Sequence, residues 1–261
     1  MIMFSQTTAK VISLTRVKSD VFVLRFRSKE LAKKCRPGNF LHIKIPPALL
    51  RRPFSINDVR GDDIMVLFRV RGKGTLLLSK YKKGDSLNIL GPLGKGFVFN
   101  KRSLAGRTDI LVAGGIGVAP LLFLAQKLKK SGAKKIFVLL GVKSKGDLVC
   151  TRDFKRLGVK VLAASDDGSC GFKGNVVLLL KDILSLETTC NIYCCGPSAM
   201  FKPVYDLIRD RREITCQVSF EQFMGCGIGT CCGCTIETAQ GYKKTCKDGP
   251  VFDIRTIFCD C

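Results

Sequence analysis

The most reactive side chains of this sequence gather near its C-terminal end. Cys226, Cys231 and Cys234 follow a C-x4-C-x2-C spacing, and Cys246 comes after eleven further residues. A [2Fe–2S] cluster takes two thiolates on each of its two irons, and this triplet with a later fourth cysteine suits it. Glycines between the cysteines give the backbone the freedom to wrap around a cluster. The spacing therefore predicts a [2Fe–2S] cluster on these four cysteines, with Cys232 as a spare thiol.

A structural zinc site and a set of buried thiols without a ligand are the other interpretations of these cysteines. Zinc favours two separate C-x2-C pairs, and Cys246 has no neighbouring cysteine to complete a second pair. A disulfide framework does not fit a chain of 261 residues without an export signal at its N-terminus. Eight of the 14 cysteines lie from Cys216 onward. Such clustering indicates metal ligation in a reducing cytoplasm.

Two short motifs in the first hundred residues could hold phosphate. Residues 52–55 read R-P-F-S after a strand-like stretch and a proline-rich turn, and residues 69–75 read R-V-R-G-K-G-T before a predicted helix. Glycines at the start of a helix let backbone N–H groups meet a phosphate. Taken alone, a surface arginine beside a packed Phe54 explains the first motif, and a plain loop-to-helix turn explains the second about as well.

Two further motifs follow strand-like stretches in the second half of the chain. Residues 113–120 read A-G-G-I-G-V-A-P between a predicted strand and a predicted helix, and residues 195–200 read C-G-P-S-A-M after a later strand. Tight turns for helix–sheet packing would explain each motif separately. Ligands of open α/β sheets bind at the carboxyl ends of the strands, which is where both motifs fall. Together they predict a dinucleotide site.

The elements that must position these motifs change in kind along the chain. Residues 8–98 alternate apolar and polar side chains between Gly and Pro turns, which is typical of a small β-barrel. In this region we expect strands at 11–14, 21–26 and 40–45 and a helix at 76–81. After residue 101, short apolar strands alternate with helices, which predicts a parallel sheet of βαβ units. Its strands are expected at 109–113, 136–140, 159–163 and 191–194, with helices at 117–130 and 197–210.

The ordered set R-P-F-S, G-x-G-T, G-G-x-G-x-x-P and C-G-P-x-x-M resembles the ferredoxin–NADP reductase superfamily over nearly the whole chain. The cysteines and K-D-G-P-V-F at residues 247–252 resemble its dihydroorotate dehydrogenase B electron-transfer subunit, as do residues 164–169. The resemblance implies an FAD-binding β-barrel domain (1–100), an NAD-binding α/β parallel-sheet domain (101–215) and a small C-terminal [2Fe–2S] cluster region (216–261). Phe54 departs from the tyrosine that is frequent in the family, and Cys259 and Cys261 match nothing in it.

By this resemblance Arg52 would bind the FAD diphosphate, Phe54 would stack on the isoalloxazine ring and Ser55 would approach flavin N5. The other implied residues of the flavin site are Pro53, Leu67, Phe68 and Arg69, with Gly74 and Thr75 at the phosphates. The nicotinamide site would consist of Gly114, Gly115, Gly117, Pro120, Cys195, Gly196 and Pro197. No catalytic side chain is expected, because hydride transfer needs the two cofactors held in position.

The resemblance implies an oxidoreductase subunit that carries FAD and a [2Fe–2S] cluster in pyrimidine biosynthesis. It would move electrons between NAD(H) and a partner, the FMN-containing dihydroorotate dehydrogenase catalytic subunit, in a cytoplasmic hetero-oligomer (a heterotetramer). Dihydroorotate itself would be oxidised on the partner. The lysines of the loop at residues 141–145 leave NAD against NADP open.

Two rival functions deserve comparison with this one. The FAD and [2Fe–2S] subunit of a ferredoxin–NADP transhydrogenase resembles this chain but usually has Asp where Cys226 stands. A basic zinc-binding, nucleic-acid-associated module is suggested by the net charge of +23. It would leave the flavin motifs without a role and lacks aromatics interleaved on a basic face, so no nucleic-acid partner is expected.

No membrane span is expected either, because glycines interrupt the longest apolar stretch. His42, the only histidine, is expected to be a structural residue of a strand.

Overall fold

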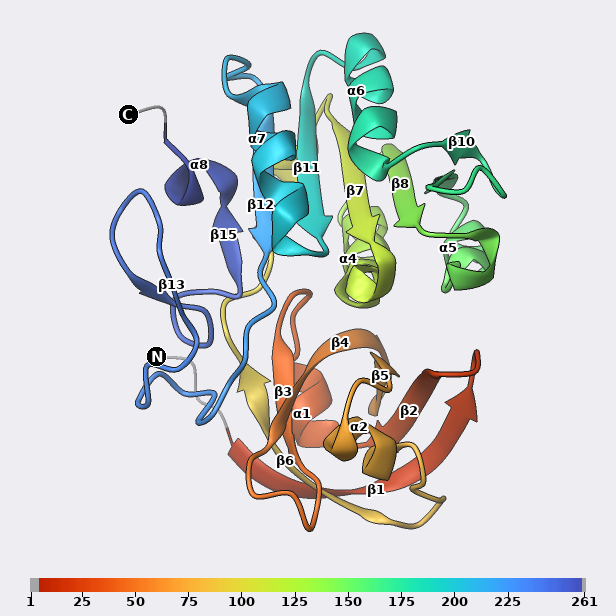
Figure 1. Ribbon diagram of the computed structural model, residues 1–261, viewed down its shortest axis with the longest axis vertical. Helices are drawn as coiled ribbons and strands as arrows, with labels where there is room; N and C mark the ends of the chain where they lie inside the picture. The colour runs from red at the N-terminus through yellow and green to blue at the C-terminus, as the bar shows by residue number, and fades with distance from the viewer. Residues whose placement is uncertain (1–4, 260–261) are drawn as a thin grey trace.

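The computed structural model describes residues 5–259, and the first part of the chain forms a closed β-barrel (Figure 1). Neighbouring strands pair antiparallel in the order β1-β2-β5-β4-β3-β6. The elements of the barrel are β1 (Ser5–Arg16), β2 (Val21–Arg27), α1 (Lys29–Lys34), β3 (Phe40–Lys44), β4 (Arg52–Arg60), β5 (Asp63–Arg69), α2 (Lys73–Leu78) and β6 (Ser86–Leu93). The predicted barrel is confirmed. Helix α2 begins three residues before the predicted start, because the Thr75 hydroxyl accepts from the N–H groups of Arg71 and Gly72 and fixes the first turn.

Strand β3 is buried on both of its faces. Leu41 and Ile43 point into the barrel and belong to its hydrophobic core. Phe40 and His42 alternate with them on the outer face, yet they are only 3% and 0% exposed. The outer face is covered by the C-terminal part of the chain, since Phe40 packs with Cys234 and Cys246.

The second part of the chain is a seven-stranded sheet in the order β10-β9-β8-β7-β11-β12-β15 (Figure 1). All neighbours run parallel except β15, which pairs antiparallel with β12 at the edge. The strands are β7 (Thr108–Gly114), β8 (Lys135–Val142), β9 (Lys160–Ser165), β10 (Phe172–Lys173), β11 (Cys190–Cys195), β12 (Thr215–Ser219) and β15 (Val251–Asp253). The helical elements are α3 (Lys101–Leu104), η1 (Gly115–Val118), α4 (Ala119–Lys130), η2 (Lys145–Asp147), α5 (Thr151–Arg156), α6 (Val176–Leu186), η3 (Ser198–Met200) and α7 (Phe201–Ile208).

Helices cover both faces of this sheet, so its central strands are apolar over most of their length. On β7, Ile110 and Val112 pack into the hydrophobic cluster of α6 and α7, while Leu111 and Ala113 pack into that of α4. The predicted parallel βαβ arrangement is confirmed. The predicted helices at 117–130 and 197–210 each begin with a short 3-10 turn, η1 and η3, before the α-helix proper.

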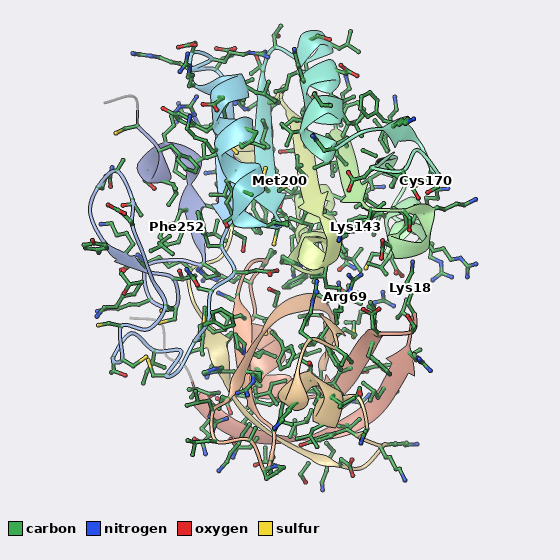
Figure 2. The ribbon with its side chains drawn as sticks, viewed as in Figure 1. Lys18, Arg69, Lys143, Cys170, Met200 and Phe252 are labelled. Carbon is green, nitrogen blue, oxygen red and sulfur yellow. The ribbon has the colours of Figure 1, made fainter. Side chains whose placement is uncertain are left out.

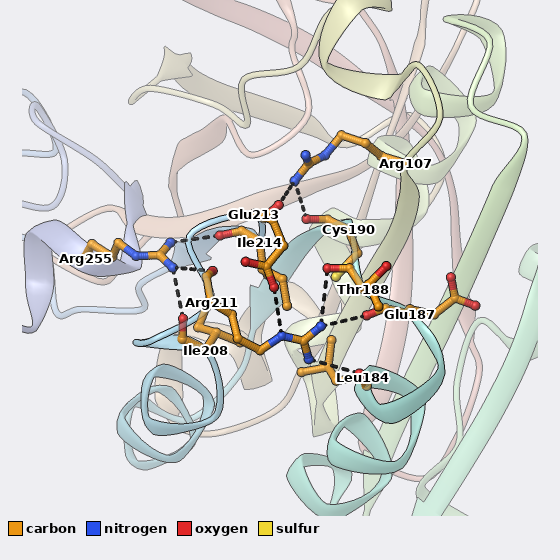
Figure 3. A network of polar contacts seen from close by, with 10 residues as sticks. All are labelled: Arg107, Leu184, Glu187, Thr188, Cys190, Ile208, Arg211, Glu213, Ile214 and Arg255. Carbon is orange, nitrogen blue, oxygen red and sulfur yellow. Dashed lines mark hydrogen bonds and ion pairs between the residues drawn. The ribbon is translucent and has the colours of Figure 1, made fainter.

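The C-terminal segment returns to the sheet after a loop-rich excursion. It contains the small hairpin β13 (Thr235–Ile236) and β14 (Lys243–Lys244), then β15 and α8 (Ile254–Ile257). Arg255 of α8 donates to the carbonyl oxygens of Ile208, Arg211 and Ile214 (Figure 3). Strands β12 and β15 therefore belong to the sheet of the α/β part, and they anchor the loops between them at both ends.

The helices within residues 5–259 include no segment that is long and apolar enough to cross a membrane.

Candidate functional site

A cavity of about 490 Å³ opens between the barrel, the α/β part and the chain that follows β12. The barrel contributes six of the predicted flavin residues to its wall: Pro53, Phe54, Ser55, Leu67, Phe68 and Arg69. Ile116 and Ala119 enter from the turn after β7. The cavity therefore lies where the R-P-F-S strand meets the carboxyl end of the parallel sheet, the place at which open α/β sheets bind their ligands.

The two predicted phosphate motifs come together beside this cavity. A Cβ added to Gly74 would lie 3.0 Å from Nε of Arg52, so the arginine passes directly over the start of α2. Arg52 also donates from Nη1 to the Leu50 carbonyl at 2.6 Å, which holds its guanidinium in place. Thr75 uses its hydroxyl to hold the turn before α2. A guanidinium next to open backbone amides is a suitable cradle for a diphosphate.

Phe54 and Arg69 take different positions in the wall of the cavity. Phe54 is 7% exposed, and its ring meets that of Phe68 edge to face with centroids 5.7 Å apart. Arg69 lies at the boundary between barrel and α/β part (Figure 2), with Nε 3.3 Å from Asp20 and Nη2 3.6 Å from Asp147. Asn57, two residues after the R-P-F-S motif, donates to the Ala119 carbonyl at 2.8 Å. These contacts tie the barrel strand to the turn that would receive a nicotinamide.

The two predicted nicotinamide motifs also touch each other. A Cβ on Gly117 would lie 2.3 Å from the carbonyl oxygen of Cys195, and one on Gly196 would lie 2.9 Å from the Gly114 nitrogen. A Cβ on Gly114 would meet Pro197 at 2.7 Å. Glycine is required here because the backbones of two neighbouring strand ends approach within side-chain distance. Pro120, also from the prediction, starts α4, while Gly115 takes a φ of 56° in the turn.

The four predicted ligand cysteines form two pairs. The side chains of Cys226 and Cys231 hydrogen-bond with each other, as do those of Cys234 and Cys246. Within residues 5–259, no group of three or more His, Cys, Asp or Glu side chains is arranged to hold a metal ion. Two pairs of thiols are the donor set that a two-iron cluster uses, with two thiolates on each iron. The residues present fit a [2Fe–2S] cluster.

Backbone amides already point at the Cys226 sulfur. The N–H groups of Ile228 and Cys231 each lie 3.4 Å from it. Burial would raise the pKa of the Cys226 thiol, but hydrogen bonds from the Thr230 hydroxyl and these amides outweigh it and lower the pKa to about 5. Burial and the neighbouring Cys234 instead raise the pKa of Cys246 to about 12. Cys226 is thus prepared to bind as a thiolate, whereas Cys246 needs a metal to displace its proton.

Phe40 and Met224 connect the cavity to the cysteines. Both line the cavity, and both belong to the apolar group that contains Cys234 and Cys246. Cys234 and Cys246 are 2% and 3% exposed, whereas Cys231 lies at the surface. Cys234 and Cys246, the inner pair, therefore face the cavity across packed side chains, whereas Cys226 and Cys231, the outer pair, face solvent.

Sequence reasoning missed the residues that the chain after β12 brings to the cavity. Ser219, Phe220, Glu221, Gln222 and Phe223 all line it. Solvent reaches Glu221 through the open cavity, but burial by the surrounding protein still raises the pKa of its carboxyl, an effect that Arg71 opposes. The signal that could have revealed these residues is the end of a parallel strand at 219, beside the ends of β7 and β11.

Known proteins resemble this chain over nearly its whole length. Residues 221–258 match the iron–sulfur cluster binding domain of dihydroorotate dehydrogenase B, and residues 111–206 match the oxidoreductase NAD-binding domain. The dihydroorotate dehydrogenase B (NAD(+)) electron transfer subunits of Caldanaerobacter subterraneus subsp. tengcongensis and Desulforamulus reducens are 39% and 37% identical to this chain. Each alignment covers 94% of this chain and 95% of the relative. The chain belongs to this family.

A solved structure supports the same fold. The NADH-dependent reduced ferredoxin–NADP oxidoreductase, described in work on flavin-based electron bifurcation, superposes with a TM-score of 0.84 at 28% identity. The match covers 97% of this chain and 91% of the other. The Amycolatopsis cytochrome P450 reductase GcoB shares the fold at 18% identity, with a TM-score of 0.70 over 82% of this chain and 69% of the other. The predicted family, fold class, oxidoreductase class and cofactors (FAD, [2Fe–2S] and NAD) are confirmed.

Proposed function

We propose that this chain is the electron-transfer half of a dihydroorotate dehydrogenase B and works with an FMN-containing catalytic subunit. Dihydroorotate gives up two electrons on that partner, and they leave this chain as the hydride accepted by NAD⁺. The packing of Phe40 and Met224 between the cavity and the inner cysteine pair carries the proposal. Such packing would connect a flavin in the cavity with a cluster on these cysteines through side chains in van der Waals contact.

The binding roles predicted for individual residues remain part of this proposal. Arg52 with Gly74 and Thr75 would hold the FAD diphosphate, and Phe54 and Ser55 would face the flavin ring. The strand-end glycines with Cys195 and Pro197 would receive the nicotinamide, where their close backbone approach excludes water. Bound FAD supplies hydride exchange with the nicotinamide and single-electron exchange with the cluster. The protein's own contribution is to position these groups and shield them.

The cluster ligands we propose are Cys226, Cys231, Cys234 and Cys246. These two pairs would place one side of the cluster toward the cavity and the other toward the surface, because the inner pair is buried beside the cavity and Cys231 is exposed. Electrons from the partner would arrive at the exposed pair and move inward. The partner should therefore dock over the loop at residues 226–234.

The division into residues 1–100, 101–215 and 216–261 is likewise proposed as functional rather than as three separate folding units. Strands β12 and β15 both belong to the sheet of the α/β part, so the cluster region is inserted into that sheet's edge. We also place the protein in the cytoplasm, because an iron–sulfur cluster needs reduced thiolate ligands.

The deciding experiment is dihydroorotate-dependent reduction of NAD⁺ by this chain co-purified with the FMN subunit. The isolated chain should reduce artificial dyes with NADH and show no turnover of dihydroorotate. Adding the partner should create the coupled activity, and the Cys234→Ser variant should abolish it while NADH–dye activity persists. Coupled turnover that survives the loss of the cluster would contradict this electron route.

A ferredoxin–NADP transhydrogenase subunit is the second candidate. The structural match to the NADH-dependent reduced ferredoxin–NADP oxidoreductase favours it, at 28% identity. A cysteine at position 226 and identities of 35–39% to dihydroorotate dehydrogenase B subunits favour the first proposal. Reduction of NADP⁺ by reduced ferredoxin, without any response to dihydroorotate and the FMN subunit, would favour the second.

A further inference from the structure

His42 sits at the junction between the barrel and the cluster region. It lies on the outer face of β3, where its partner across the ladder is Pro53 of the R-P-F-S motif. The imidazole is fully buried, and neither of its nitrogens has an aligned hydrogen-bond partner among the described residues. An imidazole always carries at least one N–H, and leaving a buried donor unpaired costs about 1–3 kcal/mol. A buried histidine in this position therefore calls for an acceptor nearby.

One backbone acceptor beside the ring belongs to the cluster loop, and a second belongs to Arg51. A Cβ added to Gly227 would lie 2.6 Å from Nδ1 of His42, and 3.2 Å from both Cε1 and Cγ. The imidazole thus occupies the space that a side chain at position 227 would need. The backbone of Cys226, on the other side of the same peptide unit, interacts with the ring. The contact falls on the peptide that joins a proposed ligand to its following glycine.

This peptide lies next to the amides that hydrogen-bond to the Cys226 sulfur. Gly227 has a φ of 74°, in the left-handed region, and this turn directs the amides of Ile228 and Cys231 toward the sulfur. Amide hydrogen bonds to cluster sulfurs stabilise the reduced, more negative state and so raise the reduction potential. A group that holds the Cys226–Gly227 peptide in place would act on the potential through these amides.

We propose that His42 is a positioning residue for the [2Fe–2S] cluster, donating an N–H to the Cys226 carbonyl and thereby setting the amide hydrogen bonds to the Cys226 sulfur. It also fastens the cluster loop to the strand beside the flavin motif. The inference rests on the ligand set proposed above. Those ligands are tested separately, because a wrong ligand set would appear as a cluster that survives serine at one of the four positions or is lost in Cys232→Ser, whereas failure of the His42 role would appear as a wild-type potential in His42→Leu.

The test compares His42→Leu, which keeps the bulk and removes the donor, with His42→Asn, which places an N–H near the position of Nδ1. The measurements are iron content, the electron paramagnetic resonance spectrum of the reduced cluster and its midpoint potential in the complete protein. His42→Leu should bind two irons with altered g-values and favour reduction at least tenfold less, which is 59 mV for one electron. His42→Asn should stay close to wild type.

The control is Ile43→Val, since Ile43 lies next in β3 but faces the barrel core. It should leave the spectrum and potential unchanged. A fully loaded His42→Leu protein with the wild-type spectrum and potential would overturn the proposal. If His42→Leu does not fold, His42→Gln replaces it, because its longer amide cannot donate from the Nδ1 position. A shifted potential for Gln beside a wild-type value for Asn supports the proposal, and equal potentials for the two overturn it.

Discussion

At the scale of single residues, Cys232 lies among the proposed ligands but differs from them in its contacts. Its φ is 58°, its thiol is exposed, and Lys244 hydrogen-bonds with it. We expect Cys232→Ser to retain two irons per chain. Serine at position 226, 231, 234 or 246 should remove the cluster, because one of the two irons would lose one of its two thiolates. Iron analysis and the visible spectrum of anaerobic protein check this, and loss of the cluster in Cys232→Ser would show the ligand set to be wrong.

Arg52 illustrates how a weak four-residue motif gains meaning from its neighbour in space. The Arg52 side chain passes over Gly74, with Nε, Cγ and Cζ close to it. A charge-assisted contact to a diphosphate contributes about 1.5–3 kcal/mol. We therefore expect Arg52→Ala to bind FAD about ten- to hundredfold more weakly while keeping its iron. Equilibrium dialysis followed by flavin absorbance measures this. Arg60→Ala, at the far end of β4 and paired with Asp58, is the matched control, and equal flavin retention in both variants would rule out the role of Arg52.

Asp109 makes the stability of the protein depend on pH. It is fully buried in β7, where it accepts from Asn191 at 2.9 Å. Burial, only partly offset by Asn191 and Tyr193, raises the pKa of its carboxyl to about 6, from 3.8. A raised pKa means that the folded state binds the proton more tightly than the unfolded chain does. The stabilisation is complete below pH 3.8 and is lost as the pH rises through about 6.

Asp109→Asn should remove this dependence, since its amide stays neutral at every pH. The free energy of unfolding of the variant should exceed that of wild type by an amount that grows between pH 4 and pH 6.5, to at most about 3 kcal/mol. Urea denaturation of the two proteins across this range measures the difference. A difference between the two proteins that stays constant across this range would contradict the assigned pKa of Asp109.

At the scale of elements, apolar runs in the sequence predicted most strands of the α/β part but not all of its helices. Helix α6 went unpredicted although Asn175 caps it, with its side chain accepting from Val177 and Leu178. Its opening run V-V-L-L-L conceals the helical period, because Leu178 is apolar although it is 47% exposed. The buried residues Val176, Leu179, Leu180 and Leu184 do follow that period. Strand β12 was missed for the opposite reason: T-C-Q-V-S is short and mostly polar, and only its place beside β11 makes it a strand. The residues that β12 leads into the cavity were missed with it.

The turn after β7 depends on its contact with the end of β11. Because a Cβ at position 117 would fall 2.3 Å from the Cys195 carbonyl oxygen, Gly117→Ala must push the two strand ends apart. We expect at least tenfold weaker binding of NADH and slower reduction of the flavin, with the cluster spectrum unchanged. Stopped-flow mixing with NADH measures both. Gly146→Ala, where a Cβ would meet only the Ser144 hydroxyl at 3.3 Å, is the control. Wild-type flavin reduction in Gly117→Ala would mean that the nicotinamide binds elsewhere.

At the scale of the whole molecule, three sites that are separate in the sequence become one linear arrangement. Motif spacing predicted a flavin site, a nicotinamide site and a cluster site, but spacing within each motif carries no information about distances between them. The return of the chain through β15 brings the cluster region against β3, so that Phe40 touches both the cavity and Cys246. This packing depends on contacts between residues roughly two hundred positions apart, which local patterns do not encode.

The surface around the outer cysteine pair should be the docking site of the catalytic subunit. Phe223 is 90% exposed only three residues before Cys226, a costly position for a large aromatic side chain unless a partner covers it. Burying a phenylalanine contributes about 1.5–3 kcal/mol, so Phe223→Ala should weaken the complex about ten- to hundredfold. Because Phe223 also lines the cavity, flavin content must be measured alongside. Leu186→Ala, equally apolar and 79% exposed on α6, should leave association unchanged.

The charge of +23 should steer an acidic partner, so the association rate should fall as salt rises from 50 to 500 mM, concentrations on the order of those that screen surface charge. Surface plasmon resonance with the FMN subunit immobilised measures affinity and rate together. Equal losses in the Phe223 and Leu186 variants would place the docking surface away from the cluster loop, and a salt-independent rate would leave the basic surface without a part in association.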